Sequence, residues 1–189
     1  MESEDLQRTT CLPHLLSKKK RGPCLYTKLP SINYQGVEVE VFKTLDFLGG
    51  IGEDFHFQGN VAYIDSTVTI AAEDRGVLTN MTRPLQGQSD WLLNAQISYE
   101  PFSGTTATLL YHYYGDRVSQ VGIETVPDFY EQAFGELNFV FIRELNDNWK
   151  VTAKAKNISD QRNEVRVSDY LVNGYFMGRE ISLQVDYTF

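Results

Sequence analysis

Residues 181–189 read Ile-Ser-Leu-Gln-Val-Asp-Tyr-Thr-Phe, a stretch in which apolar and polar side chains alternate without a break. This period of two residues is typical of a β-strand with one apolar and one polar face. A helix would repeat its apolar residues every three or four positions, and that spacing is absent. The stretch therefore predicts an amphipathic strand.

The same alternation recurs along the chain from Ser31 onward. We expect seven antiparallel strands, over residues 34–43, 55–66, 91–100, 105–114, 129–142, 149–157 and 179–189. Connections of about ten residues or fewer (44–54, 101–104 and 146–148) alternate with long ones (67–90, 115–128 and 158–178). Short turns at one end of a sheet and long loops at the other are typical of outer-membrane barrels.

Composition excludes two classes of protein. No uncharged apolar run approaches the roughly 20 residues that a membrane-spanning helix needs. Residues 1–30 hold six of the 17 Lys and Arg but only three of the 25 Asp and Glu, which leaves 11 basic and 22 acidic residues in 31–189. A nucleic-acid-binding protein would show a basic stripe, so no nucleic-acid partner is expected.

Residues 1–30 form a separate basic head, which we expect to be irregular and outside the sheet. Both cysteines, Cys11 and Cys24, lie there without His or Cys partners at metal-ligand spacing, so they predict neither a zinc site nor a disulfide framework. The acidic start and the run Lys18–Arg21 do not fit a secretory signal. An exported chain would need a signal that this sequence does not contain.

The large aromatic residues are expected to form two girdles on the apolar face, as at the two interfaces of a membrane barrel. The short-turn end carries Phe55, Phe57, Tyr99, Phe139, Phe141, Trp149, Tyr187 and Phe189, and the long-loop end carries Tyr63, Trp91, Tyr111, Tyr113 and Tyr130. Between them lie Gly59, Val61, Ala95, Ile97, Leu109, Ala133, Gly135, Val151, Ala153, Leu183 and Val185. This distribution favours a lipid-facing surface over a soluble core. Phe42 departs from the pattern because it has the polar parity.

The opposite face is polar and is predicted to line a wet lumen. We expect five residues in particular to face it: His112, Glu136, Lys150, Lys154 and Lys156. Glu136 is expected to form cross-strand ion pairs with the lysines of the neighbouring strand. Charged loop residues that could contact a cargo are Asp116, Arg117, Asp128, Arg162, Arg166 and Asp169.

No combination of residues points to catalysis. His56 and His112 stand on separate strands with no Ser, Cys or Asp at a spacing that would form a triad. Residues 49–52 (Gly-Gly-Ile-Gly) lack the Lys-Ser/Thr ending of a phosphate loop and are expected to be a turn. We therefore expect no enzyme activity, no metal site and no cofactor.

The end of the chain resembles that of TonB-dependent outer-membrane receptors. In that family a Gly-Arg pair, here Gly178-Arg179, opens a last alternating strand that ends in an aromatic residue, here Phe189. The last-strand residues that carry the resemblance are Leu183, Val185 and Tyr187. Residues 85–94 are similar to the family's entry from loop to strand, and residues 151–160 to its penultimate strand and turn. One departure is Gln184, where these barrels often have Gly.

The resemblance implies that residues 31–189 are the C-terminal part of a transmembrane β-barrel of 22 strands in the outer membrane of a Gram-negative cell. It implies as partners membrane lipid, the assembly machinery that reads the last strand, the plug and remaining strands of the receptor, and a small-molecule cargo such as a ferric siderophore. Seven strands leave two unpaired edges, so we expect the chain alone neither to close nor to transport.

A second interpretation stays open. The chain could be a free-standing β-barrel binding protein, either soluble or a small outer-membrane barrel of about eight strands. The eighth strand would have to come from residues 1–30, and the run Lys18–Pro23 argues against that. A barrel enzyme such as a lipase or protease is a more distant third, because no catalytic set is present.

Overall fold

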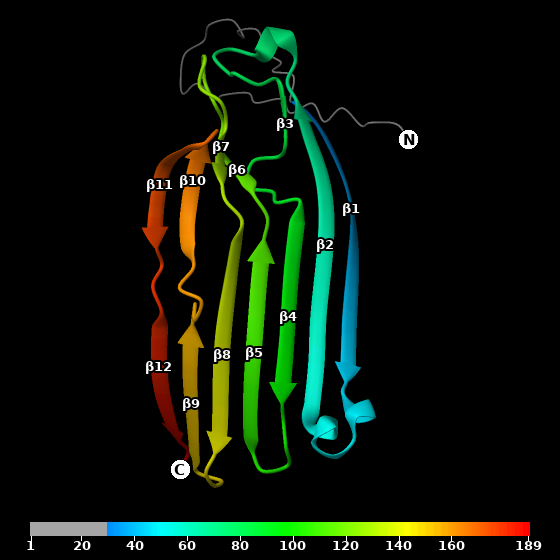
Figure 1. Cartoon of the computed structure of the whole chain (residues 1–189), viewed down its shortest axis with the longest axis vertical. Helices are drawn as coiled ribbons and strands as arrows, with labels where there is room; N and C mark the ends of the chain where they lie inside the picture. Colours follow the sequence, from blue (N-terminus) through cyan, green and yellow to red (C-terminus); the bar gives the residue numbers. More distant parts are fainter. Residues whose placement is uncertain (1–29) are drawn as a thin grey trace, which may run out of the picture.

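The computed structural model describes residues 30–189, which form an all-β structure of two antiparallel sheets (Figure 1). The prediction of a basic head over residues 1–30 therefore lies, except for Pro30, outside the described residues. The strands are β1 (Ser31–Thr44), β2 (Phe55–Thr69), β3 (Thr82–Arg83), β4 (Trp91–Tyr99), β5 (Thr105–Tyr114), β6 (Arg117–Gln120), β7 (Phe129–Glu131), β8 (Phe134–Glu144), β9 (Trp149–Lys156), β10 (Arg162–Val167), β11 (Tyr170–Phe176) and β12 (Glu180–Tyr187). Three short 3-10 helices are η1 (Asp46–Leu48), η2 (Gly50–Asp54) and η3 (Ala72–Asp74).

The larger sheet has the strand order β1-β2-β4-β5-β8-β9-β12, with β3 paired to β2. Every neighbouring pair along this path is antiparallel. The strands lie side by side, with β1 and β12 at opposite sides of the sheet (Figure 1). These pairings confirm the prediction of an antiparallel all-β fold. Within the described residues the sheet is open, so the closed transmembrane barrel stays a prediction.

The register places the alternating apolar residues of the seven strands on one face, here called the apolar face. Val61 of β2 lies opposite Val39 of β1 and Leu93 of β4, and the same parity continues across the sheet to β12. The alternate positions along each strand point to the opposite side of the sheet and form what we call the polar face, where Asn94 is opposite Asn60. The alternation of apolar and polar residues in the sequence thus produces the two faces of the sheet.

Aromatic pairs mark both ends of the apolar face. The rings of Tyr63 and Trp91 lie 4.9 Å apart at the long-loop end, and those of Trp149 and Tyr187 lie 4.7 Å apart at the short-turn end. The predicted separation from the aliphatic residues is incomplete, because Tyr111 lies opposite Ala95. The Tyr111 ring occupies the space above Gly135, where a β-carbon would collide with it.

The short-turn end consists of three compact connections. Residues 45–54 form η1 and η2, residues 100–104 turn at Gly104 with a φ of 65°, and residues 145–148 turn around Asn146. Asn146 Oδ1 accepts hydrogen bonds from the backbone N–H groups of Asn148 and Trp149, both at 3.0 Å. These turns bring the next strand directly alongside the previous one.

The second sheet, with the order β11-β10-β7-β6, continues the larger sheet at the long-loop end. In Figure 1, β6, β7, β10 and β11 stand above β5, β8, β9 and β12. The predicted strand over residues 129–142 is therefore wrong as a single element: it divides into β7 and β8 at Gln132 and Ala133. Ala133 belongs to this break and not to the apolar band. Residues 115–128 and 158–178 were expected to be loops, yet they contain β6, β10 and β11.

Burial is concentrated near the long-loop end. Within residues 30–189 the buried apolar side chains are Ala62, Val68, Val118 and Phe134, and Val118 of β6 is the most deeply buried. On the apolar face, Leu183 keeps 72% of its surface exposed, and even Leu109 in a central strand keeps 39%. The described residues place no second layer over the aliphatic part of the apolar face.

Candidate functional site

A chain of hydrogen bonds crosses the polar face. Asn60 Nδ2 donates to Glu38 Oε1 at 2.6 Å, and Asn94 Nδ2 donates to Asn60 Oδ1 at 2.8 Å. His112 Nδ1 lies 2.7 Å from Asn94 Oδ1, and Glu136 is the residue opposite His112 on the next strand. Five neighbouring strands thus contribute one side chain each to what we call the polar stripe.

The carboxylate of Glu38 sets the direction of this chain. A carboxylate only accepts hydrogen bonds, so Asn60 must turn its NH₂ group to Glu38 and its carbonyl to Asn94. By the same logic the carbonyl of Asn94 accepts from the Nδ1–H of His112. The neutral His112 ring therefore keeps Nε2 as an acceptor for a donor that is not one of these hydrogen-bonded side chains.

A shallow depression of about 260 Å³ follows the polar stripe. Its lining adds Glu40 and Gln58 to Asn60, Asn94 and His112. Its carboxylate, amide and imidazole groups share the lining with the apolar surface of Gly59, Ala95 and Leu110, so a ligand here would meet both polar and apolar atoms. It holds no arrangement of nucleophile and base.

The predicted lumen residues all lie on the polar face, but their pairing differs from the prediction. Glu136 lies opposite His112 and not opposite a lysine. Lys156 Nζ lies 3.6 Å from Glu180 Oε2, and Lys150 lies between Glu144 and Asp186 on its two neighbouring strands. The expected ion pairs with Glu136 are therefore wrong, because the register shifts the lysines toward the other end of β8.

Phe42 and His56, which also lie on the polar face, stack their rings against each other. Phe42 lies on the polar face, as its parity predicted, and its ring is parallel to that of His56 with the centroids 6.4 Å apart. His56 Nδ1 is 3.4 Å from Thr44 Oγ1. The contact gives Phe42 an aromatic neighbour, and it brings no catalytic group to His56.

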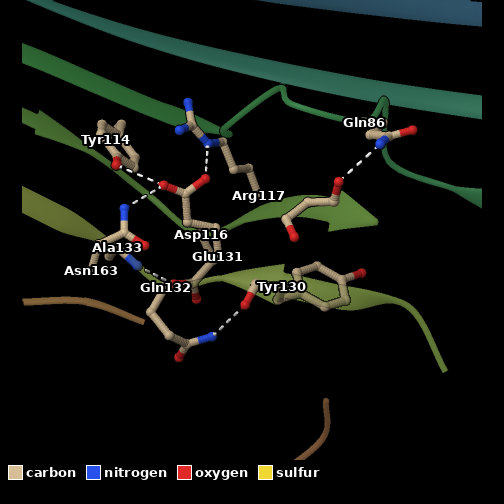
Figure 2. A network of polar contacts seen from close by, with 10 residues as sticks. Gln86, Tyr114, Asp116, Arg117, Tyr130, Glu131, Gln132, Ala133 and Asn163 are labelled. Carbon is tan, nitrogen blue, oxygen red and sulfur yellow. Dashed lines mark hydrogen bonds and ion pairs between the residues drawn. The ribbon is translucent and has the colours of Figure 1, made fainter. Parts of the chain in front are cut away.

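A second polar cluster, here called the junction network, lies where the two sheets meet (Figure 2). The carboxylate of Glu131 accepts hydrogen bonds from Tyr114 Oη at 2.9 Å, Arg117 Nε at 2.8 Å and Asn163 Nδ2 at 2.7 Å. Nearby, Asp116 Oδ1 accepts from the backbone N–H of Ala133 at 2.6 Å. The network joins the ends of β5, β6, β7 and β10, so it fixes the break between the two sheets.

Charge stabilises the junction network. Burial alone would raise the pKa of the Glu131 carboxyl, but the hydrogen bonds from Arg117, Asn163 and Tyr114 outweigh burial and hold this pKa below its ordinary value. The hydrogen bond to Glu131 raises the pKa of the Arg117 guanidinium. Both groups therefore stay charged at neutral pH and act as a fixed ion pair.

The charged loop residues named from the sequence are only partly brought together. Asp116, Asp128 and Arg166 line one depression of about 290 Å³, together with Tyr130. The pKa of Tyr130 is raised by burial and by the nearby charges of Asp128 and Asp90. Arg117 belongs instead to the junction network.

The other two predicted loop contacts lie in or beside the β10–β11 hairpin. Arg162 stacks on the Phe176 ring, with 4.2 Å from its guanidinium carbon to the ring centroid. Asp169 lies in the turn between β10 and β11. Glu164 is held between Arg162 and Arg166, and hydrogen bonding to Arg166 lowers its pKa.

Asp128 is the most buried charge of the long-loop end, at 3% exposure. Its carboxylate accepts hydrogen bonds from Asn80 Nδ2 at 2.8 Å and from the backbone N–H of Gly122 at 2.7 Å. Thr79 adds a bond from its hydroxyl to the carbonyl of Val126 at 2.7 Å. Residues 79–80 are therefore tied to the 121–128 connection by hydrogen bonds from Thr79 and Asn80.

The last strand begins after a left-handed residue. Gly178 has a φ of 74°, and Arg179 Nε donates to the carbonyl of Ile158 at 3.0 Å. β12 then pairs with β9 alone, which leaves its outer edge unpaired within the described residues. Phe189 is fully exposed and makes an edge-on contact with Tyr187, with centroids 5.0 Å apart.

Sequence reasoning did not single out Asn60, Asn94, Glu131 and Asn163, which the structure places in the two polar clusters. The alternation assigned Asn60 and Asn94 to the polar face, but only the register shows that they meet His112. Glu131 has partners 14 to 32 positions away in the chain. No local spacing signals such a cluster.

Within the described part of the chain, no group of three or more His, Cys, Asp or Glu side chains could hold a metal ion. None of the helices in residues 30–189 has the length and apolar character needed to cross a membrane. No family model, curated protein or solved structure matches the chain.

Proposed function

We propose that this chain forms part of the wall of an outer-membrane TonB-dependent receptor, which imports a scarce nutrient such as a ferric siderophore. One observation carries the proposal: an apolar face, framed by aromatic pairs, is left uncovered by the described residues over seven strands, while the opposite face carries the hydrogen-bonded polar stripe. Soluble monomers rarely expose apolar patches larger than a few hundred Å². Contact with the acyl chains of lipid would remove such a face from water.

The dimensions of the apolar face support this assignment. From Trp91 to Tyr99, β4 advances eight residues, which at about 3.3 Å per residue and a tilt of about 40° covers about 20 Å. The apolar band of outer-membrane barrels is about 25 Å tall. In this proposal the junction network and the second sheet stand outside the membrane, on the side of the long loops.

The polar face supports a wide, wet lumen. In barrels of about eight strands the interior is just wide enough to be filled by side chains. Here the polar stripe and the row of lysines carry long charged groups, and the strands spread over a broad open sheet (Figure 1). These features favour a segment of a large barrel over the small free-standing barrel of the alternative interpretation.

The proposal assigns a role to each part of the chain. The apolar face contacts lipid, the polar stripe and the lysines line the cargo path, and the last strand with Phe189 is read by the assembly machinery. The plug and the remaining strands come from the rest of the receptor. The chain performs no chemistry of its own and uses no cofactor.

Fractionation of cells tests the proposal. The full chain, expressed behind a bacterial export signal, should be recovered with the outer membrane and should resist extraction by alkaline carbonate. Expression of the same chain without the export signal is the control. A monodisperse, soluble monomer in buffer would contradict the proposal and favour the soluble barrel.

A further inference from the structure

The three short turns carry large apolar side chains that the lipid-facing surface does not explain. Residues 45–54, 100–104 and 145–148 turn at the same end of the larger sheet (Figure 1). Phe102 is completely exposed there, and four other large apolar side chains of the turns keep at least 60% of their surface exposed: Phe47, Leu48, Ile51 and Leu145. All five lie in turns, outside the strands that form the apolar face.

The same turns are acidic. They hold five carboxylates and no Lys or Arg, the carboxylates being those of Asp46, Glu53, Asp54, Glu100 and Asp147. None of the five forms an ion pair within residues 30–189. The long connections at the other end also contain acidic residues, but they include five arginines among them. A partner that meets the short turns would therefore have to supply positive charge.

The turns form one connected surface. The backbone N–H of Glu100 donates to the carbonyl of Asp54 at 2.8 Å, which joins the first turn to the second. Two adjoining depressions, of about 300 and 670 Å³, share Phe102 and Glu144 in their linings. The smaller one includes Glu100 and the larger one extends to Asp147 in the third turn. The exposed Phe102 ring thus stands among carboxylates.

One cation takes part in this lining. Lys150 lines the larger depression, and in the register it lies between Glu144 and Asp186 of the neighbouring strands. Asp186 lines the same depression. Four carboxylates and one ammonium group therefore line the two depressions, so the surface is acidic and partly apolar at once.

We propose that the short-turn end is a docking surface for a partner polypeptide segment in which Lys or Arg residues alternate with apolar ones. The apolar side chains of the segment cover Phe102 and the neighbouring turn residues, and its cations meet the carboxylates. Exposed apolar patches rimmed by polar groups mark interaction sites, and aromatic side chains are common anchors of protein interfaces. Under the proposed function this end faces the periplasm, which makes the partner a periplasmic protein.

Charge disfavours a lipid surface as the occupant. Membrane surfaces carry phosphate groups, and segments that bind them use Lys and Arg. The three turns have neither, and their five carboxylates would be repelled by anionic lipid. A basic and apolar peptide satisfies both properties of the surface, whereas lipid satisfies only its apolar part.

Fluorescence anisotropy of a labelled probe peptide tests docking to the full chain in micelles of an uncharged detergent. The probe repeats the unit Lys-Leu-Lys-Gly, and two control peptides carry Glu in place of Lys or Ser in place of Leu. Empty micelles give the background. We expect the full chain to bind the probe about tenfold more tightly than either control peptide, and salt at about 0.5 M to weaken this binding by screening.

The aromatic anchor is tested by Phe102→Ser, which should weaken binding of the probe several-fold. Phe189→Ser is the matched control, because Phe189 is equally exposed at the same end of the sheet and lines neither depression. Both side chains are fully exposed, so neither substitution removes packing from the fold. Circular dichroism verifies that each variant keeps its strands.

The charge is tested by Glu100→Gln combined with Asp147→Asn, which should also weaken binding of the probe several-fold. Glu73→Gln combined with Asp74→Asn is the matched control, since it removes the same charge from η3 at the other end of the sheet. Unchanged binding in this control and weaker binding in the turn variant support the inference.

Three results would overturn the inference. The first is binding of the Glu-containing peptide as tightly as the Lys-containing probe, and the second is undiminished binding of the probe by both turn variants. The third is quenching by brominated lipid of a single tryptophan at Phe102→Trp as strong as at Ile97→Trp, which would assign the ring to lipid. The binding assay runs equally in buffer on a chain that needs no detergent, so this inference and the proposed function can fail separately.

Discussion

Trp91 and Trp149 lie on the same face of the larger sheet, at its opposite ends. Trp91 begins β4 at the long-loop end beside Tyr63, and Trp149 begins β9 at the short-turn end beside Tyr187. They are the only two tryptophans of the chain. Tryptophan favours the two interfaces of a membrane, so this pair frames the apolar face at the levels where lipid would meet water.

The Glu131 carboxylate should make the loop-end sheet sensitive to acid. Its folded-state pKa lies below the ordinary value, so its stabilising contribution is complete above about pH 4.5 and is lost as the pH falls through the folded-state pKa. We expect the amides of β7 and β10 to lose protection from hydrogen exchange as the pH falls below about 4.5, after correction for the intrinsic exchange rate.

The matched control is Glu131→Gln, which removes the titrating group. This variant should show weaker protection at pH 7 and a smaller loss on acidification, with the remaining loss assigned to Glu164. Equal pH dependence in both proteins would show that Glu131 does not stabilise the junction.

His112 should be protonated on Nδ1 in its neutral form. The chain of hydrogen bonds that begins at the Glu38 carboxylate requires an Nδ1–H donor toward Asn94. Nitrogen NMR of labelled protein distinguishes the two tautomers of the ring. The Nε2–H tautomer in the unaltered chain would contradict this direction.

Glu38→Gln provides the control for the tautomer. An amide can donate as well as accept, so this variant removes the constraint that orients Asn60 and Asn94. We expect a mixture of His112 tautomers in Glu38→Gln and a single tautomer in the unaltered chain.

Gly122→Ala should destabilise the loop-end sheet by about 1–3 kcal/mol, the usual cost of forcing extra atoms into a packed site. A β-carbon there would collide with the backbone of Val126 and Pro127, which cannot move as a side chain does. Limited proteolysis should show faster cleavage within residues 121–128. Gly174→Ala is the control, because its β-carbon would meet no atom closer than 3.6 Å; equal cleavage in both variants would contradict the prediction.

Phe189→Ala should lower the amount of chain in the outer membrane several-fold without changing refolding into vesicles. The reason is that assembly of such barrels depends on the last strand, whereas Phe189 itself contacts only Tyr187 among aromatic rings of the described residues. Quantitative blotting of membrane fractions measures the effect. Phe102→Ala removes an equally exposed ring from a turn at the same end, and an equal loss in both variants would show that the last strand has no special part in assembly.

The seven long strands of the larger sheet could be predicted because each of them follows the alternation over eight residues or more, whereas β3 has only two residues. Residues 105–114 were predicted with the bounds that the structure gives to β5. The apolar and polar faces followed from the same parity. Even Phe42, which departs from the pattern, lies where its parity places it.

The second sheet could not be predicted in this way. β6 and β7 have four and three residues, too few to show a period. β10 is charged, and its pairing with β11 shifts register between Val165 and Arg166. These strands are stabilised by hydrogen bonds from residues distant in the sequence to Glu131 and Asp128. No local sequence pattern predicts such hydrogen bonds.

The measurement that tests the central claim most directly is quenching of tryptophan by brominated lipid. After Trp91 and Trp149 are changed to Phe, a single tryptophan is introduced at Ile97→Trp on the apolar face or at Gln96→Trp, its neighbour on the polar face. Lipids brominated deep in their acyl chains should quench tryptophan 97 strongly and tryptophan 96 little. Strong quenching at 96 with none at 97, or equal quenching at both positions, would contradict a lipid-facing apolar surface.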